Sequence, residues 1–505
     1  MTFTLPRMTP DLVRELAIGE RVCVRPLVRE VTNRDTGETV RVALPCGSTR
    51  ESLCPPCAAK ARILRMTQCA EGWHRTTDPD PDPGLGPGQE SDDDDDTDEP
   101  VADTDRRVRS TRRRQDAPDL PRIRQEATTL GREFAAPDGK TYRPSMFLTF
   151  TLPSYGRIRD GVPVDPDSYN YRRAALDALH FPKLVDRLWQ NLRRVAGFKV
   201  QYFAAVEPQT RLAPHLHAAI RGTIPRHLIR DVAKATYAQI WWPSFDTPVY
   251  TDRVPVHDRD TGRYHDPATG ELLPTWDQAI DALDADPDAR PVHVMRFGTQ
   301  LDMAGIIAPS PDADRAVRYL TKYLTKAVSD PLVGDTNSPA REAHIDRLHN
   351  ELRYLPCSPR CANWLRYGIT PENAGPGLEP GRCISKAHDR ECLGLGGRRV
   401  LVSRQWSGKT LREHRADRAA VVREALQESG IIAPEIERMA ADLLAADGKP
   451  LYQWRDVRVD PNDYTVVIFE AVRERKRWRT EYERARGRPV DNVSATYRPP
   501  DLAAS

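Results

Sequence analysis

Apolar residues recur in regular patterns between about residues 140 and 330, and they predict a folded domain there. Runs rich in aromatic and β-branched residues predict strands at 146–152, 199–207, 215–222 and 292–297. Apolar residues at helical spacing predict helices at 168–196, 225–242 and 312–328. Pro182 is expected to kink or split the first helix, because proline removes a backbone hydrogen bond. This order of elements predicts an α+β fold in which a central antiparallel sheet is flanked by helices.

The rest of the chain is expected to form smaller parts around this domain. Residues 246–290 interrupt it and are expected to form a surface hairpin or insertion. Residues 1–76 and 350–395 contain clustered cysteines and are expected to be small modules. Residues 396–505 are expected to be mainly helical. The length of 505 residues supports several domains, because it exceeds what one hydrophobic core usually holds.

Residues 77–125 have a composition that predicts a disordered linker. Between Asp78 and Asp105 the chain is rich in Pro and Gly and holds 13 acidic side chains but no Lys or Arg. Such a segment buries too little apolar surface to offset its ordering entropy. The basic tract 106–114 follows at once, and it either touches DNA, folds back on the acidic run or serves only as linker. The net charge is only +2 because of this acidic run, and the rest of the chain is basic, which suits a polyanionic partner.

The composition predicts a soluble, cytoplasmic protein. Mean hydropathy is −0.61, and no run approaches the roughly 18 apolar residues of a membrane helix, so no membrane partner is expected. The N-terminus lacks the charged start and apolar core of a secretory signal. Nine cysteines in the cytoplasm indicate metal sites more than disulfides, because thiols are kept reduced there.

Two histidines and a glutamate form the first candidate site. His215 and His217 lie on one face of the expected strand 215–222, because strand side chains alternate. Glu207 ends the preceding strand, so pairing of the two strands brings one oxygen and two nitrogen ligands together. This set suits Mg²⁺ or Mn²⁺, which would polarise a scissile phosphate as a Lewis acid. The alternative is two ordinary strand histidines that are packed or hydrogen-bonded.

The expected helix 312–328 carries the second candidate site. Tyr319, Lys322, Tyr323 and Lys326 lie on one side of it, since residues four apart are neighbours on a helix. Tyrosine has a pKa of about 10, but a metal and a lysine ammonium would favour phenolate attack on a DNA phosphate. The product is a 5′-phosphotyrosyl link with a free 3′-hydroxyl, which can be rejoined. The alternative is an amphipathic helix with half-buried tyrosines.

Eight of the nine cysteines fall into two clusters that indicate structural Zn²⁺. The first expected ligand set is Cys46, Cys54, Cys57 and Cys69, with His74 as a competing fourth ligand. Its Cys-Pro-Pro-Cys element is typical of a tight zinc knuckle. The second expected ligand set is Cys357, Cys361, Cys383 and His388, with Cys392 left over. The ninth, Cys23, is expected to be a small buried apolar side chain.

Three segments resemble the motifs of a known family. In chain order, FLTFTLP, VEPQTRLAPHLHAAI and YLTKYLTK resemble the three motifs of HUH-family rolling-circle replication initiators. The double tyrosine resembles the phage-type initiators, and the whole chain resembles initiators of actinobacterial plasmids and integrative elements. The resemblance covers residues 40–75 and 140–430, and it implies an HUH endonuclease domain at 140–330.

The resemblance also implies roles for the candidate residues. It implies metal binding by His215, His217 and Glu207, and nicking of an origin by Tyr323 or Tyr319. A supporting role would fall to Lys322. Tyr323 is preferred as the nucleophile, because it lies in the K-Y-x-x-K segment shared with single-tyrosine relatives. The expected partner is DNA, at a single-stranded or cruciform origin, and no small-molecule substrate is indicated.

No nucleotide-driven motor is expected in this chain. Gly408, Lys409 and Thr410 resemble the end of a phosphate-binding loop, but Ser403 stands where such a loop needs glycine. A host helicase is therefore an expected partner. Two other functions stay open: another HUH strand transferase (a relaxase or a single-strand transposase), and a non-enzymatic zinc-containing DNA-binding regulator. In relaxases the tyrosine usually precedes the histidines, whereas here it follows them, which favours the initiator.

Overall fold

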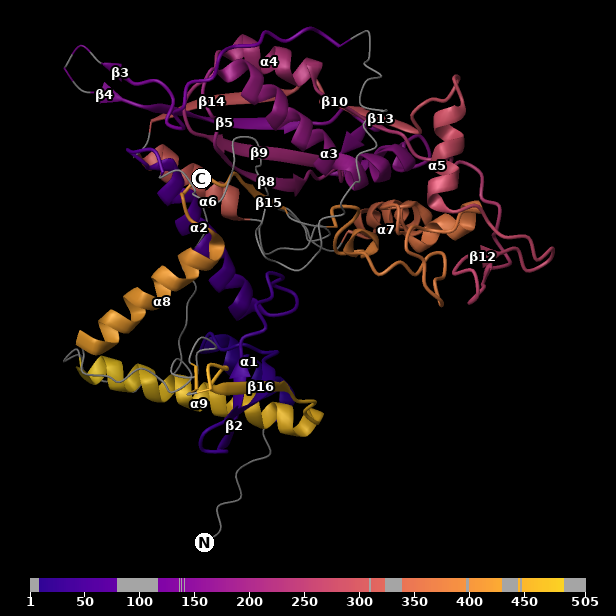
Figure 1. Ribbon diagram of the computed structural model, residues 1–505. Helices are drawn as coiled ribbons and strands as arrows, with labels where there is room; N and C mark the ends of the chain where they lie inside the picture. Colours follow the sequence, from indigo (N-terminus) through magenta and orange to yellow (C-terminus); the bar gives the residue numbers. More distant parts are fainter. Residues whose placement is uncertain are drawn as a thin grey trace. The chain divides into compact units, whose positions relative to one another are not determined.

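The computed structural model describes residues 9–79, 117–307, 310–322, 338–396, 399–428 and 444–485, apart from 136, 138, 140 and 446. It divides into two compact units, one of Met1–Leu64 with Leu411–Ser505 and one of Arg65–Thr410 (Figure 1). The basic tract and most of the acidic run lie outside the described residues. Within these residues, no helix combines the length and apolar character needed to cross a bilayer.

The larger unit is built on a five-stranded antiparallel sheet with strand order β14-β5-β9-β8-β15 (Figure 1). Its strands are β5 (Pro144–Thr151), β8 (Tyr202–Pro208), β9 (Pro214–Ile220), β14 (Leu301–Ile307) and β15 (Val400–Val402). The first three confirm the strands expected at 146–152, 199–207 and 215–222. The mixed α+β class with an antiparallel sheet is confirmed as well.

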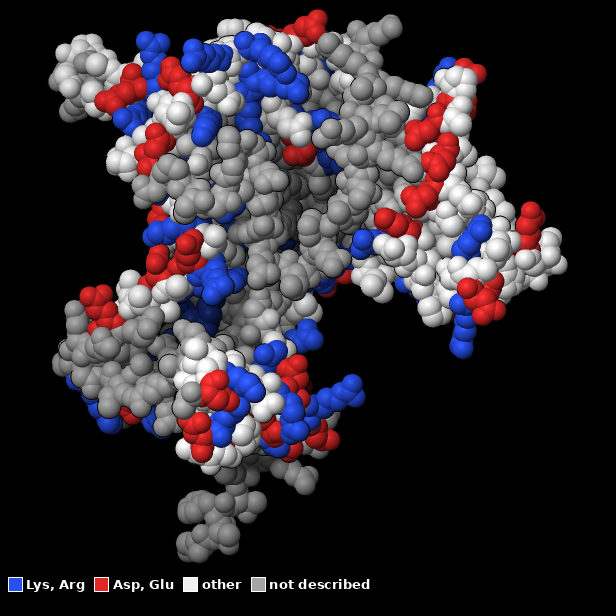
Figure 2. Space-filling view, viewed as in Figure 1, with Lys and Arg blue, Asp and Glu red and all other residues white. Residues whose placement is uncertain are grey.

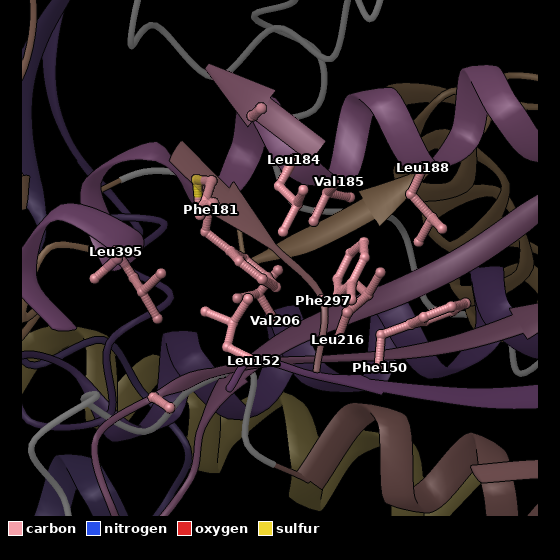
Figure 3. Close-up of a cluster of buried hydrophobic side chains, with 14 of the residues drawn as sticks. Phe150, Leu152, Phe181, Leu184, Val185, Leu188, Val206, Leu216, Phe297 and Leu395 are labelled. Atoms are coloured by element: carbon pink, nitrogen blue, oxygen red, sulfur yellow. The ribbon is translucent and has the colours of Figure 1, made fainter. Parts of the chain in front are cut away.

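One face of this sheet is covered by a long helix, α3 (Tyr171–Ala196), which continues through Pro182 without splitting. Helices α4 (Arg226–Ala235) and α7 (Pro339–Tyr354) pack beside it. Apolar side chains of α3 meet those of β5, β8 and β9 in the main core, shown in Figure 3. The residues labelled there are Phe150, Leu152, Phe181, Leu184, Val185, Leu188, Val206, Leu216, Phe297 and Leu395.

The opposite face of the sheet has a smaller core. It packs α6 (Pro311–Lys322) and the end of α2 (Pro55–Trp73) against alternate residues of the strands, with Trp406 completely buried among them. Odd-numbered residues of β5, β8 and β9 face this side, because their even-numbered neighbours face α3. The candidate catalytic residues therefore belong to the face that α6 covers.

Two expected elements differ from the structure. The helix expected at 225–242 ends with α4, and β10 (Tyr237–Ile240) follows it. That strand pairs with β13 (His293–Arg296), so the strand expected at 292–297 forms but belongs to a separate two-stranded ribbon. The expected insertion holds β11 (Val256–His257), β12 (Tyr264–His265) and α5 (Trp276–Ala285). The short strands elsewhere are β3 (Phe134–Ala135), β4 (Thr141–Tyr142), β6 (Ile158–Arg159) and β7 (Val162–Pro163).

The other unit joins the two ends of the chain in one small sheet. β1 (Leu27–Asn33) lies between β2 (Thr39–Leu44) and β16 (Tyr452–Asp456), so a C-terminal strand completes an N-terminal hairpin. α1 (Pro10–Gly19) packs against α9 (Pro461–Ala485), and their apolar side chains share a core with buried cysteines. The unit also contains α8 (Leu411–Glu428).

A buried arginine ties several segments of the larger unit together. Arg221, at the end of β9, is 3% exposed. Its guanidinium donates hydrogen bonds to the carbonyl oxygens of Gly72, Thr129, Gln405 and Trp406. It thus joins α2, the segment before β3 and the chain after β15 to the central sheet.

We expect Arg221→Met to destabilise this unit by about 3 kcal/mol, since several buried carbonyls lose a charged donor. Thermal unfolding followed by circular dichroism checks this, with Arg187→Met on the exposed side of α3 as the matched control. An equal, small change in both variants would contradict the assigned role.

Candidate functional site

The histidines and glutamate of the first candidate site are brought together by strand pairing. His215 of β9 lies opposite Glu207 of β8, and His217 lies opposite Thr149 of β5. All four residues occupy alternate positions, so they share the face of the sheet that α6 covers. The expected convergence of Glu207, His215 and His217 is thus what the register of the central strands produces.

His217 is the centre of a short chain of contacts. Its Nδ1 lies 2.9 Å from the Thr149 hydroxyl oxygen, which fixes the orientation of the ring. Its Nε2 lies 3.6 Å from Glu207 Oε2 and 3.2 Å from the Tyr319 hydroxyl oxygen. One imidazole nitrogen therefore faces both a carboxyl group and a phenol.

Aromatic rings enclose this centre. The rings of His215 and His217 stack with centroids 4.4 Å apart. Tyr319 meets His217 edge to face at 5.0 Å, and Phe147 contacts both His217 and Tyr319. The rings limit the rotamers open to the two histidines.

Burial favours the uncharged forms of all three candidate ligands. It raises the pKa of Glu207 to about 8, although the nearby charges of Arg399 and Lys322 oppose the shift. Burial, with Arg211 nearby, lowers the pKa of His215 to about 4. Burial, with His215 as neighbour, lowers the pKa of His217 to about 3. Neutral imidazoles are the form that ligates metals, and a bound cation would favour the carboxylate form of Glu207.

These residues fit a divalent cation in their chemistry. Glu207 Oε1 and His215 Nε2 are buried, and neither has a hydrogen-bond partner among the described residues. Two imidazoles and one carboxylate suit Mn²⁺ or Mg²⁺. They do not form a closed cage, however. In the part of the chain that the structure describes, ligand atoms that all lie within 4.8 Å of one another occur in two cysteine groups only.

The tyrosine motif is described in part. Tyr319 lies on α6, and its hydroxyl group contacts His217. The residue is 43% exposed, so a substrate can reach it. Lys322 is the last residue of α6 and is exposed. Tyr323 and Lys326 lie outside the described residues. Tyr319 is therefore the candidate nucleophile whose position relative to the histidines is known.

The first cysteine group differs from the expected set in one residue. Cys23, Cys46, Cys54 and Cys57 have sulfur atoms within 4.8 Å of one another. Cys23 Sγ also accepts hydrogen bonds from the backbone N–H groups of Arg25 and Cys46. Burial raises the pKa of Cys23 to about 11, although these two hydrogen bonds oppose the shift, and a bound cation would favour the thiolate, which is the form that binds zinc. This group can hold a zinc ion, and the expectation that Cys23 is only an apolar side chain is corrected.

Cys69 is not part of this group, and neither is His74. Cys57 and Cys69 lie on the same helix, α2, and twelve residues of helix span about 18 Å. Both therefore cannot bind one ion. Cys69 is fully buried in the small core beside Trp73 and Trp406, while His74 Nε2 lies 3.8 Å from an oxygen of Asp314. The expected fourth ligand is thus corrected from Cys69 to Cys23.

The second cysteine group contains the four expected residues, Cys357, Cys361, Cys383 and His388. Cys357 and Cys383 have sulfur atoms 3.9 Å apart, and Cys361 Sγ lies 3.6 Å from His388 Nε2. The Nδ1–H of His388 donates to the carbonyl oxygen of Leu352 at 2.8 Å, which leaves Nε2 free to ligate. Three thiols and one imidazole in this arrangement can hold a second zinc ion.

Two residues beside the site were not singled out from the sequence. Thr149 orients His217, and Asp302 of β14 lies opposite Thr149 in the sheet. The alternation of FLTFTL contained the signal for Thr149, because every second residue of that strand must share the histidines' face. Asp302 had no such signal, since its strand was not predicted.

Comparison with known proteins assigns the family. A family model described as "Replication initiator protein, pSAM2" matches residues 9–484. No match was found among curated proteins or among solved structures. The matched region includes both cysteine groups, the paired histidines and Tyr319, and it covers nearly the whole chain. The chain therefore belongs to the family of replication initiator proteins represented by that of pSAM2.

Proposed function

We propose that this replication initiator nicks one DNA strand at its origin through a tyrosine nucleophile and later rejoins the ends, as an HUH endonuclease and strand transferase. The observation that supports this best is the position of the Tyr319 hydroxyl, 3.2 Å from His217 Nε2 and on the same sheet face as Glu207. A candidate nucleophile thus lies beside residues that could bind a metal, which supports the proposal.

The proposed step is a transesterification at phosphorus. The phenol oxygen forms a bond to phosphorus, and the bond between phosphorus and the 3′ oxygen breaks. The phenol loses its proton and the leaving 3′ oxygen gains one, so the step needs no oxidant or nucleotide. The products are a 5′-phosphotyrosyl link and a free 3′-hydroxyl, which serves as primer. The reverse step, with a 3′-hydroxyl as attacking group, rejoins the strand.

The chain's own residues have distinct tasks in this step. Glu207, His215 and His217 would hold Mg²⁺ or Mn²⁺, which supplies Lewis-acid withdrawal of charge from the phosphate. Thr149 keeps the His217 ring in place, as its 2.9 Å contact indicates. Lys322, exposed at the end of α6, would favour the phenolate and attract the phosphate.

A host helicase is the expected partner for unwinding the origin. The loop that resembles a phosphate-binding motif has a structural role here, because Ser403 bonds the backbone of Tyr202 and Arg75 bonds the carbonyl of Ser407. A separate enzyme would therefore unwind the duplex ahead of replication.

The covalent intermediate provides the test. The protein is incubated with Mn²⁺ and a labelled single-stranded oligonucleotide from its own origin, and the adduct is measured on a denaturing gel. Tyr319→Phe is expected to lower the adduct at least tenfold, and Tyr319→Phe with Tyr323→Phe to abolish it, because a phenyl ring has no nucleophilic oxygen.

Tyr482→Phe, on α9 in the other unit, is the matched control and should leave the adduct unchanged. An adduct that survives in the double variant would refute the assignment of the nucleophile. The absence of an adduct in the unaltered protein would favour a non-enzymatic DNA-binding role. An adduct that is lost only with Tyr323→Phe would move the first attack to that residue.

A further inference from the structure

The outer side of α4 carries a row of cations. Arg226, Arg230 and Lys234 are spaced four residues apart, so they follow one another along the helix over about 12 Å. All three are exposed, while Ile229 and Val232 of the same helix are buried in the main core. In Figure 2, Lys and Arg side chains gather at the top of the view, where α4 lies in Figure 1.

Two of these cations do not stabilise the helix that carries them, whereas Lys234 lies in the last turn, where the helix dipole favours a cation. Like charges four residues apart repel each other, and none of the three forms an ion pair with another described residue. Arg226 lies in the first turn, which has no acidic residue, although the helix dipole disfavours cations there. No side chain caps the start of α4, so its first N–H groups add to the attraction for an anion. The row is thus arranged for an anionic partner.

The cationic surface continues onto α3. Asn191 of α3 donates a hydrogen bond to Thr236, directly after α4, at 3.0 Å. Arg187 and Arg194 lie four residues before and three after Asn191, on the same side of α3. The segment 122–125 then crosses the end of α3, because the N–H of Ile123 bonds the carbonyl of Arg194. That segment adds the exposed Arg122 and Arg124.

This surface is separate from the candidate catalytic site. The buried side of α4 shares the main core with the even-numbered residues of β5 and β9. Tyr319 and the small core lie on the opposite face of the same sheet. The nucleotides held at Tyr319 therefore cannot be the ones that contact α4.

We propose that Arg226, Arg230 and Lys234 of α4, with Arg187 and Arg194 of α3, bind the phosphate backbone of duplex DNA. The bound duplex is distinct from the single strand that is nicked. A protein that initiates replication handles a nucleic acid with one phosphate charge per 1.7 Å of duplex, which matches an extended cationic strip. This inference rests on the family and the charge pattern, and it does not require Tyr319 to be a nucleophile.

The test measures binding of a short fluorescein-labelled DNA duplex of mixed sequence by anisotropy over a range of salt concentrations. We expect the triple variant R226Q/R230Q/K234Q to bind about 10- to 100-fold more weakly at physiological salt. The plot of the logarithm of the association constant for the duplex against the logarithm of the salt concentration has a negative slope. This slope should become less steep by about 2.7, since each lost phosphate contact contributes about 0.9. Glutamine has a high helix propensity, so the triple variant should keep α4. Thermal unfolding of the variant checks that its fold is intact. Adduct formation with a short single strand should not change.

The matched control is R253Q/R259Q/R290Q, which removes three exposed cations from the insertion of the same unit. It should keep most of the duplex affinity and of the salt slope. Unchanged duplex binding in the α4 variant, or equal losses in both variants, would overturn the proposal. Loss of binding to anionic phospholipid vesicles with duplex binding intact would assign the surface to a membrane instead. Failure of the adduct assay alone would overturn the nicking function and leave this inference standing.

Discussion

Replacing Cys23 by alanine is expected to lower the zinc content from two ions per chain to one, whereas Cys69→Ala should keep both. The sulfur of Cys23 belongs to the group with Cys46, Cys54 and Cys57, while Cys69 is buried about 18 Å further along α2. Binding of structural zinc is worth about 10 kcal/mol or more in small modules, so the loss of a ligand also unfolds the surrounding core. Metal analysis of the purified variants measures the content directly.

Limited proteolysis adds a second measurement to this prediction. The core that contains Cys23, Cys54 and Cys57 also holds apolar residues of α1 and α9, so Cys23→Ala should expose both helices to cleavage. Cys357→Ala is the control for the second group and should remove the other ion. Two ions bound to Cys23→Ala, or one to Cys69→Ala, would restore the ligand set expected from the sequence.

The second large effect is expected at His217. His217→Ala should slow adduct formation by about a thousandfold or more, because a ligand and the contact to Tyr319 are lost together. Thr149→Val should slow it by about 10- to 100-fold, as is typical when the partner that orients a ligand is removed. Single-turnover rates of adduct formation with Mn²⁺ measure both changes.

Thr149→Ser is the matched control, since it keeps the hydroxyl group that bonds His217 Nδ1. It should recover most of the rate lost in Thr149→Val. A normal rate of adduct formation in His217→Ala would show that His217 has no role in the reaction. Equal rates in the serine and valine variants would show that the hydroxyl does not position the ring.

The central strands and the helix over them could be predicted from local pattern. β5, β8, β9 and α3 are buried and rich in apolar residues, so their periodicity is strong. The register in the structure places Glu207, His215 and Thr149 on one face. Alternation alone predicts that His215 and His217 share a face, whereas their alignment with Glu207 and Thr149 depends on the pairing register, which the sequence does not give.

The edges of the sheet could not be predicted in this way. β14 is an edge strand whose residues are mostly exposed, and Asp302 and Gly305 interrupt its apolar pattern. It becomes a strand because β5 offers a partner. Likewise, helical spacing continues past Thr236, but the helix ends there and β10 forms by pairing with β13, more than fifty residues later.

The cysteine groups show the same limit. The spacing of Cys54 and Cys57 identified a knuckle, yet spacing alone could not choose its fourth ligand. Cys23 and Cys46 lie just outside the β1–β2 hairpin, whose closure brings them together. A hairpin predicted over residues 27–44 would have favoured Cys23, and a helix predicted over residues 55–73 would have excluded Cys69.

The pairing of β1 with β16 has a consequence for synthesis of the protein on the ribosome. Arg29 lies opposite Asp456, so the partner strand of the N-terminal hairpin is synthesised more than 400 residues later. At a translation rate of roughly 5 to 20 residues per second, the delay between the two strands is about 20 to 90 seconds. The unit of Arg65–Thr410 is made before β16, and the third strand joins the hairpin only after residue 456 has been translated. A product that stops before residue 452 would thus lack this third strand, which leaves one edge of β1 unpaired and open to other strands.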